Sequence, residues 1–187
     1  MDAGFPWQTL HLSAPDYRGL QFKITDSKKT TVLYRCFPTT FGRPDLTLHR
    51  GNSTKESDEL VGSISFDPWT ETIETETPEG PVEMKTPSFR NCSYERVCNG
   101  SHEFVCNGST WLWKQVGNRL ECDLRLVDEN GTLIARLTSS MWPVCRLATI
   151  NVWKKLSPSM LDVVVVTALA EVESYHEREN SAWQAVC

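Results

Sequence analysis

Short apolar or alternating segments follow one another from Leu20 to Trp153, separated by Gly, Pro, Asn and Asp. Such spacing is typical of the strands of a β-sandwich or a β-barrel. We predict strands over residues 20–24, 31–37, 46–50, 60–66, 72–77, 82–86, 94–97, 103–106, 110–115, 120–127, 132–138 and 148–153. No long helical pattern interrupts this series, so the chain is predicted to be mainly β as far as Trp153.

The clearest predicted hairpin turns around Asn130 and Gly131, and two registers fit it. A two-residue Asn-Gly turn is a strong hairpin signal, but it sets Arg125 opposite Arg136. A four-residue loop instead sets Asp123 opposite Arg136, which pairs unlike charges across the strands. The charge pairing favours the four-residue loop.

The pattern changes after Trp153, where we predict one long helix from Pro158 to about Arg178. Ser157 stands at the N-cap, and proline is well suited to the first helical position. Four consecutive β-branched valines, residues 163–166, would also fit a strand. The cap and the length of the segment decide for a helix.

The apolar residues of this helix surround its axis, which indicates a helix enclosed on all sides. Its apolar run, residues 160–172, is shorter than the roughly 17 to 25 residues that a bilayer requires. The run also contains Asp162, whose charge suits the opening turns of a helix. We therefore expect a core helix and no transmembrane segment.

Many short strands followed by an all-round apolar C-terminal helix resemble the tubby C-terminal-like superfamily, which includes phospholipid scramblases and plant LURP-one-related proteins. The likeness is greatest to a fungal branch with no assigned chemistry. The segments that carry it are Trp111-Leu112-Trp113-Lys114, Leu124-Arg125-Leu126-Val127-Asp128, Ile134-Ala135-Arg136, Leu156-Ser157-Pro158 and Leu161-Asp162-Val163-Val164-Val165-Val166-Thr167-Ala168. The resemblance implies a closed β-barrel of about twelve strands that encloses the C-terminal helix.

We expect one domain over residues 20–178, between flexible segments at 1–19 and 179–187. The first thirty residues lack the apolar stretch of a signal peptide, so we expect a cytoplasmic protein without glycans, although sequons begin at Asn52, Asn91, Asn99, Asn107 and Asn130. Seven cysteines, an odd number, then indicate mostly free thiols. Cys187 does not form a prenylation motif.

The net charge of -5 argues against nonspecific nucleic-acid binding, which requires a basic surface. Local basic patches are still available. The candidates are Lys28 with Lys29 and Lys154 with Lys155, while Arg18 and Lys23 add to the first pair. An ordinary solvated surface would explain the same residues.

Four residues, Cys92, Cys98, His102 and Cys106, suggest a metal site at first. Five residues separate the first two, whereas zinc knuckles usually have two to four there, so we interpret all four as strand and turn residues.

Two other constellations have simple structural explanations. The Asp128 to Gly131 segment resembles a calcium loop, but Leu126 and Leu137 would stand at its first and last ligand positions. Cys36 and His49 lack a catalytic motif around them. We therefore predict no catalytic, cofactor-binding or metal-binding residues, and no enzyme.

Seven tryptophans, at positions 7, 69, 111, 113, 142, 153 and 183, could form a lipid-facing rim. Trp111 and Trp113 share one face of a predicted strand, and packing in the core explains them without a ligand.

The remaining hypothesis is a noncatalytic module that binds lipid headgroups at the membrane surface, or a protein partner. The resemblance points to phosphoinositides. The alternatives are an enzyme or a small-ligand carrier that uses a pocket at the barrel mouth, but a helix through the barrel would leave a carrier little lumen.

Overall fold

The computed structural model describes residues 4–13, 22–39, 42–51, 59–67, 72–86, 101–116, 122–140 and 147–184, with backbone alone at 122, 140, 147 and 176–184. These residues form a mainly β structure with one helix. The strands are β1 (Gln8–Ser13), β2 (Phe22–Thr25), β3 (Val32–Pro38), β4 (Leu46–Arg50), β5 (Leu60–Asp67), β6 (Thr72–Thr77), β7 (Gly80–Met84), β8 (His102–Cys106), β9 (Ser109–Gln115), β10 (Cys122–Asp128), β11 (Leu133–Ser140) and β12 (Leu147–Val152). The helix is α1 (Pro158–Gln184).

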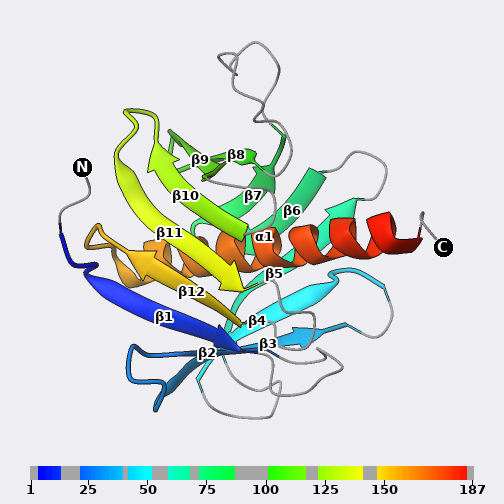
Figure 1. Ribbon diagram of the computed structural model, residues 1–187, viewed down its shortest axis with the longest axis horizontal. Coiled ribbons are helices and arrows are strands. Elements are labelled where there is room, and N and C mark those ends of the chain that lie inside the picture. Colours follow the sequence, from blue (N-terminus) through cyan, green and yellow to red (C-terminus); the bar gives the residue numbers. More distant parts are fainter. Residues whose placement is uncertain are drawn as a thin grey trace.

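All twelve strands belong to one antiparallel sheet in the order β7-β6-β5-β4-β3-β2-β1-β12-β11-β10-β9-β8. Strands that follow one another in the chain are neighbours, except β7 and β8, which are the two ends of the sheet. In addition, β1 pairs with β12. The sheet curls around α1, and one bridge between Lys85 and Glu103 joins its two ends. Figure 1 shows the helix running through the middle of this nearly closed barrel, so the predicted fold class is confirmed.

Strand β1 lies within the N-terminal segment that was predicted to be flexible, so that prediction is wrong for Gln8–Ser13. Leu10 and Leu12 alternate with polar residues and are buried, as the inner face of a strand requires. The predicted strand over residues 94–97 lies outside the described residues. The helix continues beyond its predicted end at Arg178.

The β10–β11 hairpin has neither of the two loop lengths considered. Arg125 lies opposite Arg136, as in the two-residue alternative. A bulge after Leu126 then shifts the pairing by one residue, so that Val127 lies opposite Leu133. The turn is closed by a bond from the Gly131 N–H to the Asp128 carbonyl oxygen. Arg136 still reaches Asp123 diagonally, with Nε 2.8 Å from Oδ1. The expected ion pair therefore forms without setting the register.

Helix α1 is enclosed over about three turns, because residues 162–172 are all buried. It contacts β5, β6, β11 and β12. The Met160 N–H donates to Oγ of Ser157 at 3.2 Å, which confirms the N-cap, and the helix begins at Pro158 as predicted. Trp111 and Trp113 belong to the core around the helix, also as predicted.

Gly62 lets the helix approach the barrel wall at β5. A Cβ added there would lie 2.5 Å from the Glu76 carbonyl oxygen and 2.8 Å from Cγ2 of Val166. Both distances are well inside van der Waals contact, so a glycine is required at this contact between the wall and the helix.

We predict that Val165→Asp destabilises the protein by several kcal/mol, because it places a carboxylate in an enclosed apolar position. A loss of this size lowers the thermal midpoint by roughly 10 °C or more, measured by circular dichroism. The matched control is Val105→Asp, since Val105 is 58% exposed. An unchanged midpoint in the Val165 variant would show that the helix is not enclosed.

Candidate functional site

Three segments meet at the end of the barrel where α1 begins: the residues before β1, the β2–β3 turn and the linker after β12. The pairing of β1 with both β2 and β12 brings them together, because Gln8 lies opposite Val152 and His11 lies opposite Thr25. In Figure 1 the start of β1 and the start of α1 lie on the same side of the molecule. These segments carry a set of residues that we call the aromatic-lysine rim: Phe5, Trp7, Lys28, Lys29, Lys154 and Lys155.

The two aromatic side chains of the rim are unusually open to solvent. Phe5 is 98% and Trp7 62% exposed. The ammonium group of Lys155 lies 5.2 Å from the centre of a Trp7 ring, in the geometry of a cation–π contact. The indole Nε1 of Trp153 donates to the Gly4 carbonyl oxygen at 3.3 Å, which holds this segment against the β12–α1 linker.

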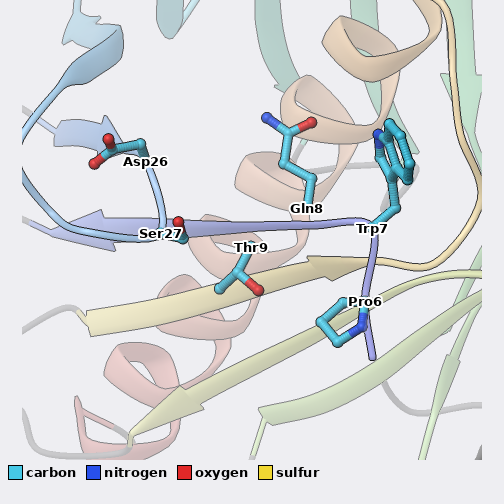
Figure 2. Close-up of a pocket in the computed structure, with 6 residues that line it drawn as sticks. All are labelled: Pro6, Trp7, Gln8, Thr9, Asp26 and Ser27. Carbon is cyan, nitrogen blue, oxygen red and sulfur yellow. The ribbon is translucent and has the colours of Figure 1, made fainter. Parts of the chain in front are cut away.

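A pocket of about 320 Å³ lies between the start of β1 and the β2–β3 turn (Figure 2), lined by Pro6, Trp7, Gln8, Thr9, Asp26 and Ser27. Trp7 and Gln8 project to one side of β1 and Thr9 to the other. The pocket therefore offers an indole ring, a side-chain amide, hydroxyl groups and the Asp26 carboxylate beside the lysines of the rim. It suits a small polar group better than an apolar one.

Acidic residues at this end reduce the positive charge of the rim. Asp26 accepts hydrogen bonds from the N–H groups of Thr30 and Thr31, at 2.9 and 3.2 Å. These bonds, led by the one from Thr31, lower the pKa of Asp26. Asp128 likewise closes its own turn, and its pKa is lowered, chiefly by the bond from Thr132. The four lysines are all exposed, and the charge of Lys154 contributes to the lowered pKa of Asp128.

A second polar group lies inside the barrel, at the first turns of the helix. Asp162 accepts a hydrogen bond from the Tyr34 hydroxyl at 2.8 Å and one from Arg50. Glu59 lies 3.5 Å from Nε of the same arginine. Burial raises the pKa of Asp162, while Tyr34 and Arg50 oppose that shift. Asp162 therefore fixes the helix to β3 and β4. From the sequence we expected only that its charge would suit the dipole of the first helical turns.

A third polar contact ties the middle of the helix to β8. Nδ1 of His102 lies 2.8 Å from Oε1 of Glu171, and both side chains are buried. A carboxylate in this position needs such a partner, since an unpaired buried charge is very costly. The sequence signal for these contacts was two acidic residues within the apolar run of the helix, residues 160–172.

Two constellations that we set aside in the sequence, the metal set and the Cys36–His49 pair, are not assembled by the residues that the structure describes. Cys92 and Cys98 lie outside the described residues, while His102 is engaged by Glu171, and the described residues contain no group of three or more metal ligands. Cys36 and His49 come from adjacent strands but occupy opposite faces of the sheet: Cys36 is in the core, and His49 packs edge-on against Phe37.

Among the described residues, Cys36 and Cys106 are free thiols, as predicted for most of the cysteines. Both are buried, and burial raises the pKa of each thiol. Neither has the lowered pKa of a reactive nucleophile.

Comparison of the chain with protein-family models, curated proteins and solved structures finds no match. Inferences about function therefore come from the residues of this chain. No helix in the described part of the chain has both the length and the apolar character needed to span a bilayer.

The bond between Tyr34 and Asp162 predicts a specific alkaline pH dependence. Burial, followed by the Asp162 charge, raises the pKa of Tyr34 above its ordinary value of 10.0. Its contribution to stability is thus present below pH 10.0 and is lost as the pH rises from there towards the higher folded-state pKa.

We expect Tyr34→Phe to cost about 1 to 3 kcal/mol near neutral pH, because a buried carboxylate loses its donor. Urea unfolding from about pH 8 to pH 11 should show this difference shrinking as the pH rises. A difference that stays constant over that range would contradict the bond between Tyr34 and Asp162.

Proposed function

We propose that this protein is a noncatalytic module that attaches peripherally to anionic lipid surfaces through the aromatic-lysine rim. One observation carries the proposal: two lysine pairs far apart in the sequence lie at the same end of the barrel as two exposed aromatic side chains. Basic and aromatic side chains together are typical of surfaces that bind the membrane interface.

The charge distribution favours a single oriented mode of binding. The chain as a whole carries a net charge of -5, so anionic membranes repel most of its surface. Each lysine close to an anionic surface contributes about 1 kcal/mol at moderate salt. The rim is therefore the part of the described surface that we expect to face the lipid, with the helix axis pointing towards the membrane.

Phe5 and Trp7 would add a part of the affinity that salt does not screen. Trp prefers the headgroup region of a bilayer, where its ring is half in apolar surroundings. A lipid phosphate would compete with the Trp7 ring for the Lys155 ammonium group, since the cation–π contact at an exposed site is worth only about 0.5 to 1 kcal/mol. Binding would thus separate the two side chains and free both for the lipid.

The pocket beside Trp7 is a suitable size for the polar head of one lipid, and Gln8 and Ser27 are its candidate hydrogen-bonding groups. The resemblance to tubby-like proteins suggests a phosphoinositide, and the barrel around one helix supports that resemblance. A small-ligand carrier is the alternative. It would have to use this same pocket, because the helix occupies the axis of the barrel.

The proposal is tested by sedimentation with vesicles of phosphatidylcholine alone, or with phosphatidylserine or a phosphoinositide added, at several salt concentrations. We expect binding to anionic vesicles that weakens as salt rises. Lys28→Gln with Lys29→Gln should weaken it by about 2 kcal/mol, or roughly 30-fold, and Lys154→Gln with Lys155→Gln by a similar factor.

The matched control is Lys85→Gln with Lys114→Gln, which removes the same charge from exposed positions just after β7 and on β9. Equal loss of binding in the control would reject the rim as the site. Absence of salt-sensitive binding to any anionic vesicle would reject lipid attachment altogether and favour a protein partner.

A further inference from the structure

The barrel wall is complete except at one seam. All other neighbouring strands in the sheet are joined by at least three residue pairs, as between β1 and β2. Between β7 and β8 the described residues make one bridge, in which Lys85 and Glu103 exchange two backbone hydrogen bonds of 2.9 and 2.7 Å. We call this junction the β7–β8 seam.

The ladder stops where the next pair should form. Continuing the antiparallel register from the bridge would set Glu83 opposite Val105 and Pro81 opposite Asn107, yet neither pair is formed. Pro81 has no N–H to donate. Strand edges left without a ladder rely on other contacts to stay together.

A side-chain clip takes the place of the ladder near the start of the helix. Nδ2 of Asn107, at the tip of the β8–β9 hairpin, lies 2.7 Å from Oε2 of Glu79 and 3.3 Å from Sδ of Met160. Glu79 also accepts a hydrogen bond from Ser159. These groups are exposed, and such bonds typically contribute only about 0.5 to 1.5 kcal/mol each.

Apolar side chains lie directly behind the seam. Val82 and Met84 of β7 and Phe104 and Cys106 of β8 are all buried in the core. At the other end of the seam, the bridge and the buried contact between His102 and Glu171 hold the start of β8 against the helix. In the described part of the chain, β8 beyond Glu103 forms no ladder with β7, and the two strands are joined there by the clip and by the apolar side chains behind the seam.

We propose that the barrel opens at the β7–β8 seam by a swing of the β8–β9 hairpin tip about the bridge, while the rest of the sheet and the helix stay folded. Opening separates the clip and exposes Cys106 together with the apolar side chains behind it. It gives access to the interior without global unfolding. Local openings of this kind occur where few bonds oppose them.

Cys36 provides an internal reference for the opening. Cys36 is 0% and Cys106 4% exposed, and Cys36 lies in β3, whose neighbours β2 and β4 both form extended ladders with it. The two thiols can be compared in one sample by alkylation of the folded protein with N-ethylmaleimide, followed by peptide mass spectrometry. We expect Cys106 to react at least about ten-fold faster than Cys36.

Two asparagine variants test the clip. Asn107→Gly removes the clip without strain, because Asn107 has a φ of 50° that glycine readily adopts. It should speed alkylation of Cys106 several-fold and leave Cys36 unchanged. Asn130→Gly makes the same substitution at the tip of the β10–β11 hairpin, away from the seam, and should change neither rate.

A reversible lock tests the seam itself. Lys85→Cys with Glu103→Cys places two thiols on a hydrogen-bonded antiparallel pair, whose Cα separation of about 5.5 Å allows a disulfide. Because the bridge is the hinge and stays closed during the swing, the oxidised protein should alkylate Cys106 at the same rate as the wild-type protein.

The proposal is overturned if Cys106 and Cys36 react at the same rate in both the wild-type and Asn107→Gly proteins. Equal rates would mean that both thiols become accessible only by global unfolding. A marked slowing of Cys106 alkylation in the oxidised lock would show that the bridge itself must open, and would reject the bridge as the hinge.

Discussion

The structure depends on enclosing a helix that is apolar on every side. Residues 162–172 leave no helix face for solvent, so one sheet packed on one side could not bury them. A sheet that curls around the helix solves this problem. It also explains Gly62, where the wall comes so close to Val166 that no side chain fits.

Two carboxylates determine how the enclosed helix is placed in the barrel. Asp162 and Glu171 lie on the buried part of the helix, and an unpaired charge in either position would be very costly. Tyr34 and Arg50 meet the first, and His102 meets the second. Because these partners come from β3, β4 and β8, they allow one rotation and one depth of the helix in the barrel.

Because the helix fills the interior of the barrel, we look for a binding surface on the outside. The helix occupies the axis, while the ends of the strands carry the exposed groups. At the end where α1 begins, Trp7 and the lysine pairs form the rim that we propose binds lipid. The β7–β8 seam is a separate feature of the wall. There, one backbone bridge, between Lys85 and Glu103, takes the place of a full ladder.

The main elements could be predicted because their signals are local. Ser157 and Pro158 marked the helix start, and the apolar run after them marked its enclosure. Strand β1 was missed because Leu10 and Leu12 form a short pattern in a polar segment. The hairpin register was misjudged because Arg136 reaches Asp123 diagonally, which a direct-pairing rule does not consider.

The candidate site was less predictable, because it depends on contacts between distant segments. The two lysine pairs were visible in the sequence, but nothing local showed that β1 would bring them together. Phe5 gave no signal at all, since exposure depends on what covers a residue in the fold. The partner of Glu171 was equally hidden, as His102 is far from it in the chain.

The most direct test of the enclosed helix is native-state hydrogen exchange, measured residue by residue. If the barrel surrounds the helix, the amides of residues 163–172 exchange only through global unfolding, with the same free energy as those at the centre of β12 and a higher one than those at the tip of the β8–β9 hairpin. Exchange of these helix amides through an opening of lower free energy than that of β12 would contradict the account.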